Sequence, residues 1–200
     1  MTFTRIFSIT VIVSVLFLAG CASTGKGSGY SAPKGPVSSA AQSQYKSALA
    51  TMKRRDYTSA LKKFKTLSVK YPKFAGPKAN MAIIYTRKGQ YKKAETAFME
   101  AISLNSANPG IYNELGVFYR RTGKFEKSAK AYEKALSIDS EFAYAHLNLG
   151  ILYDIYLRRN NRALRHYNKY QELVKNDKLV HKWIVDLKLR IKRNEKVAQR

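Results

Sequence analysis

The sequence is poor in the residues from which most catalytic and metal sites are built. Its 200 residues include one cysteine, Cys21, and three histidines. The histidines, His146, His166 and His181, are scattered without the spacing typical of metal ligands. No Ser-His-Asp arrangement and no working pair of carboxylates can be argued from the spacing. We therefore expect no enzyme, no metal site and no cofactor.

Acidic residues are also scarce, with 13 against 37 lysines and arginines, so the formal net charge is +24. The excess is uneven along the chain. Between Lys46 and Lys93 the only acid is Asp56, and the chain is basic again from Arg158 onward. In a cytosolic protein, such a charge would make nucleic-acid binding a leading hypothesis. Which negatively charged partner the protein could bind therefore depends on its compartment.

The amino terminus indicates that compartment. Arg5 precedes an apolar run, Ile6 to Leu18, which is shorter than the roughly 20 residues of a membrane-spanning helix. The run closes on Leu18-Ala19-Gly20-Cys21, which resembles the lipobox of bacterial lipoproteins. The resemblance implies a signal peptide over residues 1–20, cleavage before Cys21 and lipidation of its thiol. Several acyl chains on one residue give a nearly permanent membrane anchor.

The residue after the cysteine bears on which membrane is used. Ala22 stands where an inner-membrane lipoprotein would have aspartate under the enterobacterial sorting rule, so we expect an outer-membrane anchor facing the periplasm. This location excludes nucleic acid as a partner. The remaining polyanions are peptidoglycan, anionic lipid and acidic proteins. Lys62, Lys63 and Lys65 are the candidate basic surface.

The segment 21–41 is rich in Gly, Ser, Ala, Pro and Lys and predicts a flexible tether. Beyond it the chain repeats with a step of 34 residues. Small residues and aromatics each keep this step. The positions in register are Ala48, Ala82, Gly116 and Gly150; Tyr85, Tyr119 and Tyr153; and Phe64, Phe98 and Tyr132. Small residues are suited to a close crossing of two helices, and the aromatics to filling the space around it.

This period resembles the tetratricopeptide repeat, a helix-turn-helix unit. The resemblance implies an all-α solenoid with four repeats over residues 42–176, at about 42–74, 75–108, 109–142 and 143–176. Gly89 and Gly123 fall at the turn, where a left-handed residue ends the first helix. The fourth unit has one additional residue between Tyr153 and Ala163, for which we expect a widened turn at residues 158–161.

The last segment, 177–200, is expected to form a capping helix with a basic tail. Asp177 is a helix-capping residue, and the apolar residues after it recur on one helical face. These residues are Val180, Trp183, Ile184, Leu187 and Ile191. A solenoid needs such an element to cover the apolar surface of its final repeat. We therefore expect two helices per repeat and one cap, nine in all.

In tetratricopeptide-repeat proteins, ligands usually lie in a groove lined by the first helix of each unit and often contact its sixth residue. The resemblance therefore implies a partner-binding groove in this chain. Asparagine amides suit a peptide backbone, and arginines suit a carboxylate. The candidate groove residues are Asn80, Asn113, Glu114, Arg120, Arg121 and Asn148.

The function implied is an outer-membrane-anchored scaffold that binds an envelope protein. The segments 163–171 and 183–187 resemble small repeat lipoproteins of TonB-type energy-transducing systems. Two alternatives stay open. One is a pilotin-like lipoprotein of type IV pili, which carries a secretin, and the other is an adaptor that brings murein hydrolases to peptidoglycan.

Overall fold

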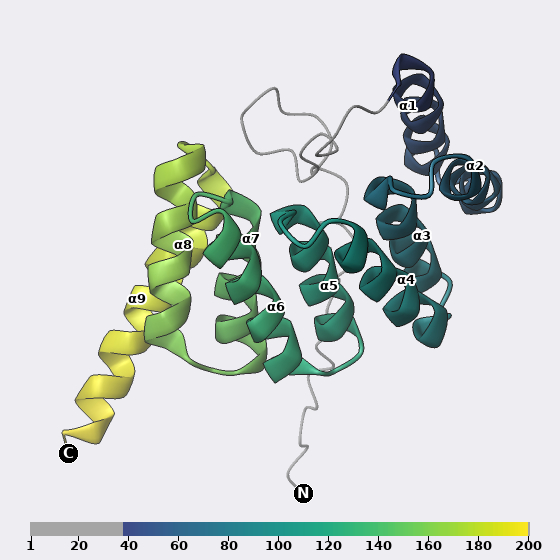
Figure 1. Ribbon diagram of the computed structural model, residues 1–200. Helices are drawn as coiled ribbons and strands as arrows, with labels where there is room; N and C mark the ends of the chain where they lie inside the picture. The colour runs from purple at the N-terminus through teal and green to yellow at the C-terminus, as the bar shows by residue number, and fades with distance from the viewer. Residues whose placement is uncertain (1–37, 200) are drawn as a thin grey trace, which may run out of the picture.

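The computed structural model describes residues 38–199, which form an array of nine α-helices and one π-helical turn without a strand. The helices run from α1 at one end to α9 at the other (Figure 1). Their bounds are α1 Ser39–Lys53, α2 Tyr57–Lys70, α3 Ala75–Arg87, α4 Tyr91–Leu104, α5 Pro109–Arg121, α6 Phe125–Ile138, α7 Ala143–Ile151, η1 Leu152–Tyr156, α8 Asn160–Val174 and α9 Lys178–Ala198. The expected all-α architecture is confirmed.

The helices pair as the repeat period predicts. Helices α1, α3, α5 and α7 are the first helices of four units, and α2, α4, α6 and α8 are the second helices. The first helices α3, α5 and α7 start at residues 75, 109 and 143, so each start follows the previous one by 34 residues. The expected tether is shorter than predicted at its carboxyl end. Helix α1 begins at Ser39, so residues 39–41 of the expected tether are helical. Residues 21–37, which include Cys21, lie outside the described part of the chain.

The third and fourth units each close where a glycine of the first helix meets an aromatic ring of the second helix. A methyl group on Gly116 would lie 2.4 Å from a carbon of the Tyr132 ring, and one on Gly150 would lie 2.4 Å from the Tyr167 ring. The Ser128 hydroxyl donates to the Gly116 carbonyl at 2.8 Å across the same crossing. A larger residue at these glycines would force the two helices apart, which costs about 1–3 kcal/mol.

The turns within the units use left-handed residues. Gly89 has φ 72° and Gly123 has φ 74°, as the sequence predicted. The amide of Lys124 donates to the Tyr119 carbonyl at 2.9 Å, which is a hydrogen bond typical of a helix ending in glycine. In the first and fourth units the same position is held by Arg55, with φ 65°, and Arg158, with φ 51°.

The expected widening of the fourth turn is wrong. Its turn, residues 157–159, has the same length as residues 122–124 of the third unit, and residues 160 and 161 belong to α8. The additional residue is accommodated earlier, where α7 continues into the π-helical turn η1. A π-helical turn takes one more residue than an α-helical turn, so the insertion is absorbed within the helix.

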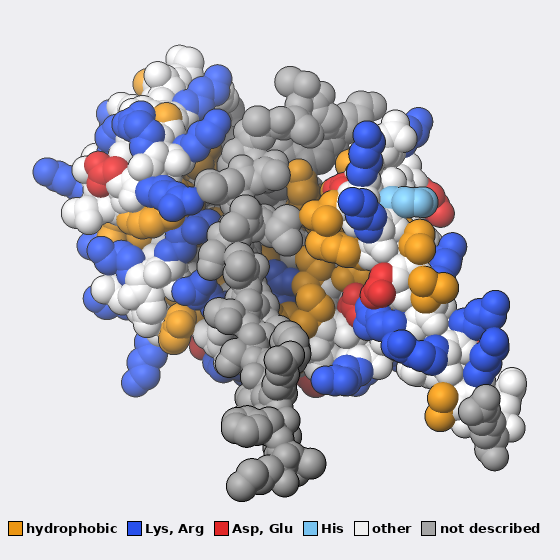
Figure 2. All heavy atoms as spheres, turned by 180° about the vertical axis from the view of Figure 1, so that it is seen from behind, with side chains coloured by type: hydrophobic (Ala, Val, Ile, Leu, Met, Phe, Trp, Pro, Cys, Tyr) orange, Lys and Arg blue, Asp and Glu red, His pale blue; other side chains and the backbone are white. Residues whose placement is uncertain are grey.

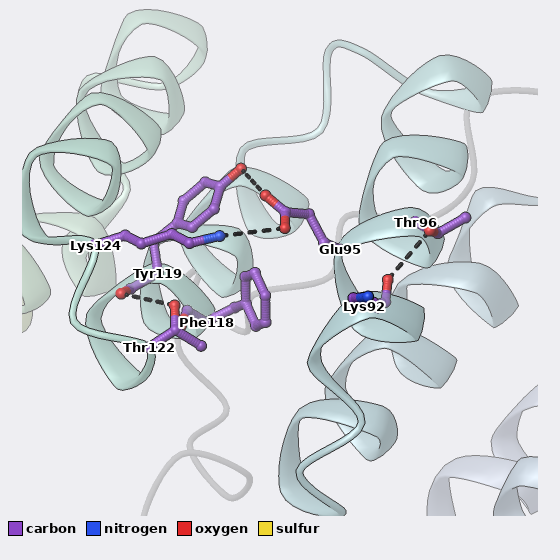
Figure 3. Close-up of polar contacts among 7 residues, drawn as sticks. All are labelled: Lys92, Glu95, Thr96, Phe118, Tyr119, Thr122 and Lys124. Carbon is purple, nitrogen blue, oxygen red and sulfur yellow. Dashed lines mark hydrogen bonds and ion pairs between the residues drawn. The ribbon is translucent and has the colours of Figure 1, made fainter.

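Neighbouring units are also joined by polar contacts. Glu95 of α4 accepts hydrogen bonds from the Tyr119 hydroxyl of α5 at 3.0 Å and from the Lys124 ammonium at 3.3 Å (Figure 3). At the end of α5, the Thr122 hydroxyl donates to the carbonyls of Phe118 and Tyr119. The bonds to Glu95 fix the end of α5 against the preceding unit, and the Thr122 bonds close the end of the helix itself.

Helix α9 covers the fourth unit, as expected. The Asp177 carboxylate accepts from the backbone amides of Leu179 and Val180 and so caps the helix. The expected apolar stripe packs on the core around Tyr167, with Val180, Ile184 and Leu187 buried and Trp183 and Ile191 partly buried. The ring of Trp183 lies 5.7 Å from that of Tyr167. Trp183 is therefore a packing residue of the cap.

Candidate partner-binding face

The first helices contact one another along the array, whereas the second helices mainly contact the first helices of their own and the next unit. Helix α5 lies against both α3 and α7. The first helices therefore form the tighter layer of the array. We call the surface of this layer at α5 and α7 the inner face, and its residues are Glu114, Val117, Arg120, Arg121, Asn148 and Ile151.

Asparagines hold this layer together. Asn80 of α3 donates to the Tyr45 hydroxyl of α1 at 2.7 Å and to the Gly76 carbonyl at 2.9 Å, and its exposed fraction is 1%. Asn148 of α7 donates to the Asn113 side-chain oxygen of α5 at 2.9 Å, and Asn113 is also buried. Asn80 and Asn113 are thus turned into the helix layer, and we remove them from the set of partner-contacting candidates.

Glu114 lies half-buried beside these amides. The Asn113 amide donates to its carboxylate at a long 3.4 Å, and no described residue forms an ion pair with it. Burial raises the pKa of Glu114, while the nearby Arg87 guanidinium, the Asn113 amide and the Arg120 guanidinium act in the opposite direction. The carboxylate therefore sits in a poorly solvated site near two guanidiniums that do not bind it directly.

The two arginines of the inner face are available for a partner. Arg120 is half-buried and Arg121 is exposed. Within residues 38–199, neither forms an ion pair or a side-chain hydrogen bond. Val117 lies about one helical turn before Arg120 and Arg121 on α5, and both Val117 and Ile151 of α7 are only partly buried. The inner face thus offers unpaired guanidiniums next to apolar surface, which suits a peptide that carries a carboxylate.

The expected basic surface on α2 divides into two kinds of lysine. Lys62 and Lys65 are exposed. The Lys63 ammonium instead donates to the Ser47 and Thr51 hydroxyls of α1, at 3.0 and 2.9 Å, and so links the two helices of the first unit. Figure 2 shows many Lys and Arg side chains, and few Asp and Glu, on the face of the molecule that it presents.

The fold brings together two histidines that the sequence separates by 20 positions. The Nδ1 atoms of His146 in α7 and His166 in α8 lie 3.0 Å apart, and the His166 ring stacks on Tyr153. His146 Nε2 lies 3.1 Å from the Ser140 carbonyl, which can only accept. His146 therefore carries its proton on Nε2, and neutral His146 accepts at Nδ1 from His166.

This pair was not visible in the sequence, because contact between α7 and α8 depends on the register of the two helices. Burial is the main cause that lowers the pKa of both rings. Electrostatic interactions with His146, Arg165 and Arg162 lower the pKa of His166 further, to about 4.

Among the described residues, no group of three or more His, Cys, Asp or Glu side chains could hold a metal ion. None of the described helices is both long and apolar enough to cross a membrane.

Comparison with known proteins identifies the repeat. A family model described as the TPR, or tetratricopeptide, repeat matches residues 83–123 and 118–154. Residues 83–154 are tetratricopeptide repeats, and the described part of the chain has the tetratricopeptide-repeat fold. The matched segments cover α4 to α7 and include the inner face. Tetratricopeptide repeats form a family of protein-interaction scaffolds that are generally not enzymes. No curated protein matches the sequence.

Solved structures share the tetratricopeptide-repeat fold. PilF of Pseudomonas aeruginosa is 18% identical, with a TM-score of 0.70, over 80% of this chain and 72% of that one. PilW, a widely conserved type IV pilus biogenesis factor, is 21% identical, with a TM-score of 0.67, over 76% and 70%. A thermophilic tetratricopeptide-repeat protein of Thermus thermophilus is 21% identical, with a TM-score of 0.67, over 74% and 81%. At these identities the similarity shows the fold alone.

Proposed function

We propose that this tetratricopeptide-repeat protein is a lipid-anchored scaffold of the bacterial envelope that holds a protein partner on its inner face. The observation that carries this proposal is the pair of unpaired guanidiniums, Arg120 and Arg121, beside the partly exposed apolar residues Val117 and Ile151. An acidic or carboxylate-terminated segment would satisfy the guanidiniums with charge-assisted hydrogen bonds. Its apolar side chains would cover the neighbouring surface.

Anchoring rests on the lipobox-like sequence that ends at Cys21 and on Ala22 after it. The outer membrane is the proposed location. The residues between Cys21 and α1 provide a tether between the anchor and the repeats. A tethered scaffold would meet its partner at the membrane surface, where the effective concentration of both is high.

Type IV pilus assembly is the envelope pathway that we propose. PilF and PilW share the fold over most of this chain, and PilW is described as a pilus biogenesis factor. The motif that resembles TonB-associated lipoproteins has a packing explanation. Its residues Ala163, Tyr167 and Tyr170 are buried in α8, and Ile184 and Leu187 of α9 pack in the same core. We therefore attribute that motif to the packing of the cap on the fourth unit and not to a TonB-type pathway.

The partner proposal predicts the effect of reversing the inner-face charge. Arg120→Glu combined with Arg121→Glu should abolish crosslinking of the partner in cells, because two favourable charge pairs become repulsive. The matched control is Lys130→Glu with Lys134→Glu, two exposed residues of α6 that change the net charge equally. Quantitative crosslinking and circular dichroism would measure binding and folding. Loss of the partner in the α6 control, or in Lys62→Glu with Lys65→Glu, but not in the arginine variant would overturn the inner-face proposal.

The anchoring proposal predicts that Cys21→Ser leaves an unprocessed precursor without lipid, because a hydroxyl does not replace the thiol in the modification. Palmitate labelling and membrane fractionation would measure the effect. Labelling that persists in the variant, or wild-type protein that fractionates without membranes, would contradict the proposal.

A further inference from the structure

Helix α9 carries two opposite stripes of side chains. The inner stripe, Val180, Ile184, Leu187 and Ile191, packs on the fourth unit, where its first three residues are buried. The spacing of four, three and four residues keeps these side chains on one side of the helix. The opposite side of α9 therefore faces away from the solenoid along its whole length.

The outer stripe repeats the same spacing with a different composition. Its members are Lys178, Lys182, Val185, Leu189, Lys192 and Lys196, and all six are exposed. Val185 is 46% exposed and Leu189 is 63% exposed. The four lysines take part in no ion pair within the described part of the chain. The stripe thus places two apolar residues at its centre and two lysines at each end.

The carboxyl-terminal half of α9 extends past the units it caps, as the yellow end of the ribbon shows (Figure 1). From residue 192 to residue 199 every side chain is exposed. The segment from residue 192 onward contributes nothing to the core, yet the helix continues for about two turns past Ile191, to Ala198. Within the described part of the chain, its basic residues Lys192, Arg193 and Lys196 have no ion-pair or hydrogen-bond partner that explains them.

A second copy of the chain does not fit the outer stripe. In a parallel or an antiparallel pair of α9 helices, the terminal lysines of one copy would face lysines of the other, which is destabilising. A large protein interface does not fit either. Lysine is depleted from the centre of such interfaces, and two apolar side chains provide little of the apolar area they need.

We propose that the outer stripe of α9 binds the surface of an anionic phospholipid membrane. Lysines at both ends of the stripe lie over acidic headgroups, while Val185 and Leu189 enter the boundary of the acyl chains. Four to eight basic residues on an amphipathic helix are typical of anionic-lipid recognition. Each lysine near the surface strengthens binding about fivefold. Nucleic acid would use the charge but leave Val185 and Leu189 without contacts.

This surface is separate from the inner face, so the inference does not depend on the partner proposal. It gives the protein a second membrane contact in addition to the proposed lipid on Cys21. The two contacts would hold the repeats in a fixed orientation on the membrane. Such an orientation would leave α3, α5 and α7 to the partner.

The test is lysine footprinting of the full chain on vesicles of phosphatidylglycerol and of phosphatidylcholine. An amino-terminal lipid would hold the chain on both kinds of vesicle, so the readout is local to α9. We expect protection of the four stripe lysines from an amine-reactive reagent on phosphatidylglycerol, at least fivefold and lost at high salt. Protection should be absent on phosphatidylcholine. Lys130 and Lys134 of α6 serve as internal controls and should stay reactive.

Two variants sharpen the test. Lys182→Glu with Lys192→Glu should remove the protection of Lys178 and Lys196, whereas Lys130→Glu with Lys134→Glu should not. Leu189→Ser should weaken protection without a change in charge. Equal protection on both kinds of vesicle, equal protection of the α6 lysines, or protection that survives the α9 reversal would overturn the proposal. So would protection by duplex DNA or polyglutamate that matches that by phosphatidylglycerol.

Discussion

The His146–His166 contact is the residue-scale feature with the clearest physical consequence. Each ring is partly buried, and the hydrogen bond between the Nδ1 atoms requires one ring to accept. Arg162, Arg165 and Lys169 surround the pair with positive charge, and Glu172 is the acid that favours protonation of His146. Protonation of both rings therefore breaks the bond and adds charge to a basic region.

The pair predicts a loss of stability in mild acid. The folded state lowers the pKa of His166 from its ordinary 6.5 to about 4, so folding favours the neutral ring. The stabilisation is fully present above about pH 6.5 and is lost as the pH falls toward 4. Solvent screening at these half-buried rings limits the effect to about 1 kcal/mol, or roughly 2–4 °C in melting temperature.

The measurement is the melting temperature between pH 7 and 4 for three proteins. His166→Phe keeps a ring against Tyr153 but removes the titration, so its melting temperature should fall less with acid than that of the wild type. His181→Gln is the control, because His181 is exposed on α9. It should keep the wild-type pH dependence. The same slope in His166→Phe and the wild type would refute a role for the pair.

At the scale of the element, the π-helical turn η1 does more than absorb an insertion. It places Asp154 where its carboxylate accepts from Arg190 of α9 at 2.8 Å and from the Tyr167 hydroxyl at 3.4 Å. The side chain of Asp154 is 10% exposed and that of Arg190 is 34% exposed. The turn thus links the first helix of the fourth unit to the cap through a largely buried ion pair.

Asp154→Asn should therefore loosen the cap. The substitution leaves the Arg190 guanidinium without its more buried partner, which costs about 2 kcal/mol after allowance for the exposure of Arg190. The melting temperature should fall by roughly 4–8 °C. Hydrogen exchange should rise in α9 while that of α3 and α4 stays unchanged.

The matched control is Asp186→Asn, since Asp186 binds the same guanidinium at 2.9 Å but is 68% exposed. An exposed pair four residues apart on a helix contributes only about 0.3–0.5 kcal/mol. Its removal should leave the melting temperature nearly unchanged. A larger effect from Asp186→Asn than from Asp154→Asn would show that η1 does not hold the cap.

At the scale of the whole molecule, the repeat period was sufficient to predict the array, because each unit buries its small and aromatic residues in the same way. The positions of Gly89, Gly123 and the cap residue Asp177 followed from local backbone chemistry. What the period could not reveal is which side of a first helix a polar residue faces. Asn80 lies at the expected groove position, yet its amide bonds Tyr45 and Gly76 inside the layer.

The insertion shows the same limit on the scale of one turn. Counting residues detected the additional residue in the fourth unit, but a loop and a π-helical turn can each absorb it. The choice is made by burial: η1 keeps Leu152 and Tyr153 in the core and directs Asp154 toward Arg190. These contacts come from α8 and α9, which follow later in the sequence. They could not be inferred from the register alone.

The cap decides whether the array is a stable unit. Deletion of residues 177–200 would remove Val180, Ile184 and Leu187 from the core and uncover Tyr167 and Tyr170. Burial of each aliphatic side chain contributes about 1.5–3 kcal/mol, so we expect the free energy of unfolding to fall by about 5 kcal/mol or more. Because the deletion exposes apolar surface, an apolar dye should bind the protein in thermal melts. Among the described residues, deletion of residues 192–200 removes only exposed side chains, so it should leave the melting temperature within a few degrees. It also takes away Lys192 and Lys196, so this shorter deletion should weaken the footprint on anionic vesicles while the fold persists. Equal melting temperatures for the two deletions would show that the repeats are stable without α9.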